Sequence, residues 1–135
     1  MVKNIRHFGI TIRNLEQDLY FYKKLLGFEE VKREELEGNY IENLLNIKGI
    51  KLTYVKLKLK GTKVLLELWY FPNMNFVEQH SSHFALTVDN LDELITKLND
   101  NKIAFFSPPI ENNKVKVCFC RDFSGNIIEL VEEIK

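Results

Sequence analysis

The sequence lacks three features that would set it apart from ordinary globular proteins. It has no surplus of either charge, because 19 basic side chains balance 19 acidic ones. A nucleic-acid-binding protein usually carries a basic surplus, so that class is disfavoured. No apolar run approaches the roughly 20 residues that cross a bilayer, and the first ten residues have no apolar core of the kind found in signal peptides. We therefore expect a cytoplasmic protein that binds neither nucleic acid nor membrane.

Cysteine is also scarce, with only Cys118 and Cys120 present. Residues two apart on a strand point to the same side, so a disulfide between these two would be strained. The sequence offers no third cysteine as a partner. Two reduced thiols on a strand are the favoured interpretation, and a C-x-C metal or redox site is the alternative.

What the sequence does contain is an internal repeat. The stretch HFGITIRNL at 7–15 is matched by HFALTVDNL at 83–91, with five of nine positions identical. In both copies the asparagine can cap a helix, because a glutamine or glutamate follows three residues later, as in a capping box. The repeat therefore predicts two copies of one strand-then-helix unit.

The same order of elements continues through each half. Periodicity predicts helices at 15–26 and 91–100, and strands at 5–12, 28–33, 50–59, 64–70, 83–88, 103–106, 115–121 and 126–132. We expect a short helical connection at 35–49, a linker at 72–82 with His80 at the surface, and a loop at 107–113 because Pro108 and Pro109 exclude a helix interior or central strand. Each half thus reads β-α-β-β-β. At 135 residues the chain has the size of a single domain, with module one at about 1–73 and module two at about 80–135.

The last strand of each half repeats its chemistry as well. LLEL at 65–68 and IIEL at 127–130 place Glu67 and Glu129 in the same apolar frame. A carboxylate there is costly unless its charge is offset. If the halves are related by pseudo-symmetry, both glutamates can converge with His7 and His83 on a divalent nickel, cobalt, iron, manganese or zinc ion. Taken singly, each could instead be a hydrogen-bonded histidine or a solvent-facing glutamate.

Four stretches carry a resemblance to a known family: HFGITIRNLEQDLYFYKKLLGFE, LLELWYF, HFALTVDN and CRDFSGNIIELVEE. They resemble the vicinal oxygen chelate superfamily, which includes glyoxalase I, methylmalonyl-CoA epimerase, extradiol dioxygenases and bleomycin-resistance proteins. The resemblance covers nearly the whole chain. It implies an α+β fold of two tandem βαβββ modules forming a curved mixed sheet around a cleft, with the helices outside. It also implies a homodimer, a small-molecule substrate and no organic cofactor.

By this likeness, His7, Glu67, His83 and Glu129 fall on the four metal positions of glyoxalase I. In that family the metal polarises a substrate carbonyl and stabilises the enediolate formed when a neighbouring C–H loses its proton. A carboxylate acts as the base, here Glu129 first and Glu67 second. The resemblance thus implies a metal-dependent lyase or isomerase. The complete ligand set argues against a dioxygenase, while an epimerase and a non-catalytic binding protein are the alternatives.

The sequence departs from the family's pattern at three positions. Thr11 stands where glyoxalase I often has an arginine that contacts glutathione, Phe71 where it tends to have asparagine, and Phe123 where the closing motif usually has proline. An epimerase would want a second carboxylate on the third strand, but 50–59 contains no acid. Glu67 or a glutamate of 34–42 would have to replace it.

Strand alternation and the family resemblance indicate which residues line the expected substrate pocket. Trp69 shares a strand face with Glu67 and is expected to wall the pocket, although it could equally be core. Further candidates for the lining of the substrate pocket are Tyr54, Thr11 and Lys116. The connection at 37–49 is expected to act as a lid, because loops of this kind often carry function.

Overall fold

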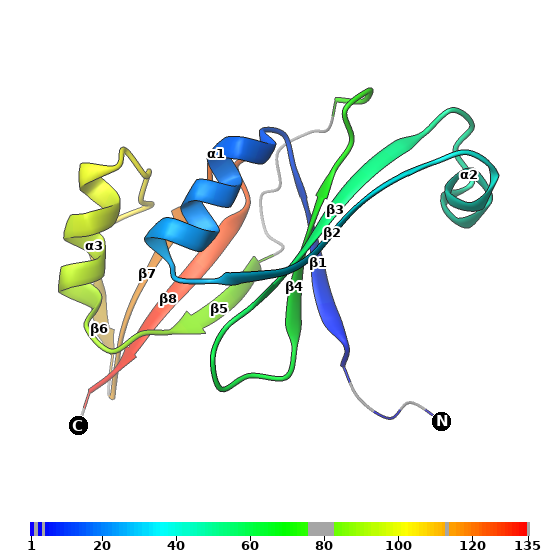
Figure 1. Ribbon diagram of the computed structural model, residues 1–135. Helices are drawn as coiled ribbons and strands as arrows, with labels where there is room; N and C mark the ends of the chain where they lie inside the picture. The colour runs from blue at the N-terminus through cyan, green and yellow to red at the C-terminus, as the bar shows by residue number, and fades with distance from the viewer. Residues whose placement is uncertain (2, 4, 76–82, 113, 135) are drawn as a thin grey trace. The chain divides into compact units, whose positions relative to one another are not determined.

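The chain forms two compact units, Met1–Val77 and Glu78–Lys135. The computed structural model describes residues 1, 3, 5–75, 83–112 and 114–134 (Figure 1). Most of the predicted linker, with His80, lies outside these described residues. None of the described helices is long and apolar enough to cross a membrane.

The first unit is one four-stranded mixed sheet with helical connections. Its strands lie in the order β1-β4-β3-β2, with β1 parallel to β4 and the other neighbours antiparallel. In chain order the elements are β1 (His7–Ile12), α1 (Leu15–Leu19), a π-helical turn η1 (Tyr20–Leu25), β2 (Glu29–Glu37), α2 (Asn39–Leu45), β3 (Lys51–Lys58) and β4 (Leu65–Tyr70).

The second unit repeats this topology. Its strands lie in the order β5-β8-β7-β6, and β5 is again parallel to the last strand of its unit. The elements are β5 (His83–Thr87), α3 (Leu91–Asp100), β6 (Ile110–Asn112), β7 (Val115–Arg121) and β8 (Ile127–Glu133). The predicted α+β class and the two tandem modules are confirmed.

One predicted strand is wrong. Segment 103–106 forms only a single bridge, from Phe105 to Cys120, and the fourth strand of the second sheet is β6, which falls in the predicted loop at 107–113. Pro108 and Pro109 precede this strand rather than interrupt it, and an edge strand tolerates prolines at its start. The apolar residues of 103–106 reflect packing instead, since Ile103 is buried.

Both predicted helix starts are confirmed by their caps. The Asn14 side-chain oxygen accepts a hydrogen bond from the Gln17 backbone N–H at 3.0 Å, and the Asn90 oxygen accepts one from the Glu93 N–H at 3.1 Å. Each cap satisfies a backbone donor that the first helical turn leaves without an intrahelical partner. The first helical segment ends before Gly27, whose φ of +83° is costly for other residues.

In the second unit, one face of the sheet forms the core and faces α3. Ile128 and Leu130 of β8 and the free thiols of Cys118 and Cys120 of β7 are buried on this face. The first turn of α3 is tied to the sheet, because the Leu91 N–H donates to Glu132 at 2.7 Å. The opposite face of the same strands therefore carries the side chains that alternate with these, including His83 and Glu129.

Candidate functional site

In the first unit, strand register brings His7 and Glu67 together. The parallel β1–β4 pairing sets Gly9 opposite Glu67, so the glutamate shares a face with His7, two residues before Gly9. His7 Nδ1 lies 3.2 Å from Glu67 Oε2. Two of the four predicted ligands are thus neighbours on one sheet face.

Glu67 is buried, and each of its carboxylate oxygens has a partner. Its residue is only 5% exposed. While Oε2 faces His7, Oε1 accepts a hydrogen bond from the indole N–H of Trp69 at 2.8 Å. These contacts offset the cost of a buried carboxylate. They also fix its orientation, as hydrogen bonds to a metal-binding carboxylate commonly do.

The second unit holds the matching pair. Ala85 pairs with Glu129 as Gly9 pairs with Glu67, and His83 Nε2 lies 3.4 Å from Glu129 Oε2. The two pairs differ in detail. His83 presents Nε2 to its glutamate where His7 presents Nδ1, and the Glu129 side chain is 25% exposed against 7% for Glu67.

Aromatic side chains border His83 in the second unit. Its ring meets Phe119 edge-on at 5.5 Å between centroids, and Phe119 in turn packs against Phe106 at 5.9 Å. The Arg121 guanidinium lies 4.8 Å from the centre of the Phe106 ring. A ligand at His83 would meet an aromatic and cationic surface.

The donor set fits a divalent first-row metal. Each unit contributes an imidazole nitrogen and a carboxylate oxygen that face each other across 3.2 or 3.4 Å, and these are ligands that zinc, nickel, cobalt, iron and manganese accept. Among the residues described, no group of three or more histidine, cysteine, aspartate or glutamate side chains is gathered as a metal site. Each unit therefore supplies a pair, and the four-ligand site stays a prediction.

Tyr54 lies on the His7 face in a network that the sequence did not reveal. Its hydroxyl donates to Glu34 Oε2 at 2.6 Å, and Lys32 Nζ lies 3.2 Å from Glu34 Oε1. The hydrogen bond from Tyr54, aided by Lys32, lowers the pKa of the Glu34 carboxyl. The same hydrogen bond raises the pKa of Tyr54. Glu34 is one of the glutamates of 34–42. Its alternation with Leu36 is the only feature of the sequence that indicates which strand face it occupies.

The predicted lid packs beside these aromatic residues. Ile41 of α2 belongs to a buried cluster with Ile50, Leu52 and Phe71. Tyr54 and Trp69 pack against this cluster, and α2 joins the ends of β2 and β3 (Figure 1). Trp69 therefore contacts both Glu67 and the core under α2.

Thr11 and Lys116 take different places. Thr11 is opposite Trp69 in the β1–β4 register, on the same face as His7. Lys116 lies on the α3 face of the second sheet, opposite in direction to Glu129. Its ammonium group lies 2.7 and 2.8 Å from the two Asp92 carboxylate oxygens, and this contact raises the pKa of Lys116. The structure does not bring Lys116 to Glu129.

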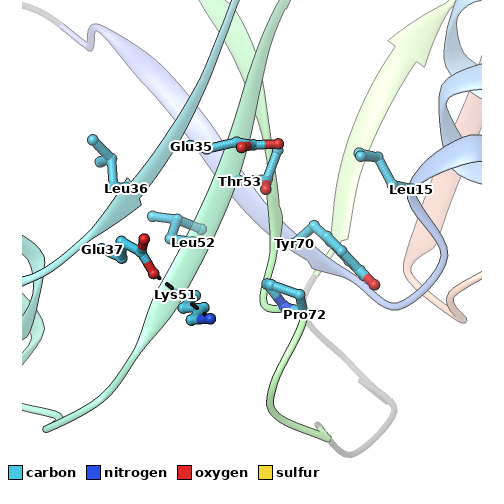
Figure 2. A pocket seen from close by; sticks show the side chains of 9 residues that line it. All are labelled: Leu15, Glu35, Leu36, Glu37, Lys51, Leu52, Thr53, Tyr70 and Pro72. Carbon is cyan, nitrogen blue, oxygen red and sulfur yellow. Dashed lines mark ion pairs between the residues drawn. The ribbon is translucent and has the colours of Figure 1, made fainter.

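A separate hollow lies where the first sheet meets the start of α1. It has a volume of about 440 Å³, and its wall includes Glu35, Thr53, Tyr70 and Leu15. Figure 2 shows Glu35 beside Thr53 on neighbouring strands, with the Glu37–Lys51 ion pair close by. Glu35 and Tyr70 alternate with Glu34 and Trp69, so they point away from the face of His7.

Comparison with known proteins identifies the family to which the sequence is similar. The sequence model of the family described as "Glyoxalase/Bleomycin resistance protein/Dioxygenase superfamily" matches residues 4–130. No curated protein matches the chain.

Solved structures share the fold over nearly the full length. A glyoxalase family protein from Bacillus cereus is 17% identical with a TM-score of 0.86, covering 100% of this chain and 99% of its own. A glyoxalase family protein from Enterococcus faecalis is 25% identical with a TM-score of 0.69, covering 96% and 98%. TnmS3, an antibiotic binding protein from a Streptomyces species, is 20% identical with a TM-score of 0.67, covering 98% and 97%.

Proposed function

Since the chain belongs to the glyoxalase/bleomycin resistance protein/dioxygenase superfamily, we propose that it is a metal-dependent lyase or isomerase of the glyoxalase I type. One observation carries the proposal: a strand histidine faces a strand glutamate at the same register in both units, at 3.2 and 3.4 Å. Core packing alone does not require a carboxylate on these strands, so its repetition with a facing histidine supports a functional role for the pairs.

The proposed site uses His7, Glu67, His83 and Glu129 to hold one nickel, cobalt, zinc, manganese or iron ion. Such an ion would polarise the substrate carbonyl and stabilise the negative charge that develops when the neighbouring carbon loses its proton. No organic cofactor is needed for this chemistry. The homodimer and the cytoplasmic location remain predictions from the sequence.

Glu129 is the proposed base, and Glu67 is proposed to position the metal. A base must be able to reach the C–H hydrogen. Glu67 is held by both His7 and Trp69 and is buried, so it has little freedom to move. The Glu129 side chain is more exposed, which supports its assignment as the group that accepts the proton.

The first test is metal analysis of protein purified without chelators, followed by assay of methylglyoxal with glutathione and with other thiols. We expect about one divalent ion per site and thermal stabilisation by nickel, cobalt or zinc. Protein that carries no such ion and gains no stability from any of them would refute the enzyme proposal. Inactivity with every thiol would remove the lyase but leave an isomerase.

The second test is Glu129→Gln, compared with Glu111→Gln at an exposed position of β6. We expect the first variant to lose roughly 10²–10⁴-fold in turnover, the typical contribution of a general base, while its unfolding midpoint stays near that of the wild type. Glu111→Gln should retain full turnover. Full activity in Glu129→Gln would contradict the base assignment.

A methylmalonyl-CoA-type epimerase is the second enzyme candidate, and Glu34 favours it. This carboxylate faces the same side of the sheet as His7, next to Tyr54 on the acid-free third strand. Its lowered pKa keeps it ionised but makes it a weak base. Deuterium exchange at the α-carbon of methylmalonyl-CoA tests this candidate, and no exchange would exclude it.

A non-catalytic small-molecule-binding protein is the candidate from outside the enzymes. The similarity to TnmS3, described as an antibiotic binding protein, favours it, as do the aromatic side chains of Phe119 and Phe106 beside His83. Tight binding of an aromatic compound by protein without metal, together with no turnover in any assay above, would favour this function over catalysis.

A further inference from the structure

The first unit has a hollow beside His7 that the proposed chemistry does not use. Its volume is about 660 Å³, within the range of small-molecule pockets. Arg6, His7, Lys56 and Lys63 line it together with the aliphatic side chains of Ile5, Val64 and Leu65. It therefore adjoins a proposed metal ligand and combines cationic groups with an apolar wall.

The backbone gathers these cationic groups at one end of the sheet. The Arg6 carbonyl accepts a hydrogen bond from the Leu65 N–H at 3.2 Å, so the chain entering β1 lies beside the chain entering β4, which follows Lys63. Lys56 of β3 is paired with Glu67 of β4. Strand β3 and the segments that enter β1 and β4 thus contribute to one cationic wall.

The charges on this wall have one sign, although Lys56 Nζ also lies 5.7 Å from the centre of the Tyr54 ring and its charge helps to lower the pKa of Glu34. Arg6, Lys56 and Lys63 are cationic, and none of the described residues that line the hollow is acidic, although the whole chain is neutral. Glu67, the register partner of Lys56, is already held by His7 and Trp69. A cleft lined by charges of one sign concentrates ligands of the opposite sign.

We propose that this hollow binds the anionic end of the substrate, a carboxylate or a phosphate, while the reacting carbonyl lies at His7 and Glu67. The inference rests on the proposed function and names its substrate class, an acidic carbonyl compound. Arg6 suits forked hydrogen bonding to either anion, and Lys56 and Lys63 add point charges. The aliphatic side chains of Val64 and Leu65 cover the carbon chain between the two ends. The other end of β1 carries the uncharged Thr11 on the same face, so it offers no cationic side chain there for the anion.

The hollow can be tested without turnover. Metal-free, ¹⁵N-labelled protein is titrated at constant ionic strength with inorganic phosphate, with glutarate and with neutral glutaramide, and amide shifts are followed by NMR. We expect saturable shifts at Arg6, His7 and 63–65 with phosphate or glutarate and none with glutaramide. The tighter of the two anions identifies the group.

Two substitutions and one control complete the test. Arg6→Gln and Lys63→Gln should each weaken anion binding about 5- to 10-fold, while Lys60→Gln, in the same β3–β4 loop but outside the hollow, should change it by less than 2-fold. Absence of saturation with both anions, or equal weakening by Lys60→Gln, would overturn the inference.

Metal analysis of the same protein distinguishes failure of anion binding at the hollow from failure of the proposed function. Metal retention without anion binding would overturn the cationic hollow and leave the proposed enzyme intact. Anion binding at Arg6 and Lys63 in a protein that retains no divalent metal would support the hollow and overturn the proposed enzyme.

Discussion

The turn between β7 and β8 depends on one buried carboxylate. Asp122 is 5% exposed. Its Oδ1 accepts hydrogen bonds from the backbone N–H groups of Ser124 at 2.9 Å and Asn126 at 2.8 Å, and its Oδ2 accepts one from the Asn126 side chain at 2.8 Å. Asp122→Ala removes both acceptor oxygens, so all three hydrogen bonds are lost and the buried donors lose these partners.

The expected loss can be worked out from these bonds. A hydrogen bond to a charged group contributes about 1.5–3 kcal/mol, but local relaxation and entering water recover part of the total. We therefore expect Asp122→Ala to lower the free energy of unfolding by about 3 kcal/mol, near the upper end for single substitutions. For a chain of this size that shift moves the urea midpoint down by roughly 1–3 M.

Urea unfolding followed by two signals measures this effect. Trp69 is the single tryptophan and lies in the first unit, whereas Asp122 lies in the second. Fluorescence therefore reports the first unit, and circular dichroism reports both. If the units unfold as one, both transitions should move together. If they unfold separately, only the dichroism transition should move.

Asp89→Ala is the matched control, because Asp89 is an exposed aspartate in the same unit. This substitution should change the free energy of unfolding by less than about 0.5 kcal/mol, as surface substitutions usually do. A shift for Asp122→Ala no larger than that of this control would refute the reasoning about the buried carboxylate.

Three further predictions concern other parts of the chain. Trp69→Phe removes the donor to Glu67 and should weaken metal affinity about 10-fold; an unchanged affinity in a cobalt titration would show that the indole does not orient the ligand. Arg33, with Lys23, lowers the pKa of Glu30 from 4.5 to about 2, so its stabilisation exists above pH 4.5 and disappears as the pH falls toward 2. Glu30→Gln should therefore lower the unfolding free energy by about 1–2 kcal/mol at pH 7 and hardly at all at pH 2; equal losses at both would contradict this. Burial raises the pKa of Cys118 to about 11 and of Cys120 to about 12, so thiol reagents at pH 8 should label both only after unfolding, and fast labelling of folded protein would count against it.

Local patterns in the sequence predicted most of the fold. The capping asparagines at 14 and 90 act over three residues, so the sequence alone determined both helix starts. β6 could not be found in this way, because a three-residue edge strand exists only through its pairing with β7. Its position depends on a partner strand rather than on its own composition.

In the candidate site, too, the features set by local sequence could be predicted, and those set by the pairing of distant strands could not. The repeat placed His7 near Glu67 and gave the second unit the same pair, because a two-residue alternation preserves the face. The face of Lys116 relative to Glu129 depends on the β7–β8 register, which no local pattern specifies. The Tyr54–Glu34 hydrogen bond likewise needs two strands, 20 residues apart in sequence, to be aligned.

The two histidine–glutamate pairs are copies that have become unequal. One copy offers Nδ1 to a buried, doubly held carboxylate, and the other offers Nε2 to a more exposed one. Duplication of a module supplies each functional group twice, so the surroundings of one copy can change while the other copy keeps its contacts. The two pairs are therefore chemically distinguishable, because a ligand that binds at His7 meets different surroundings from one that binds at His83.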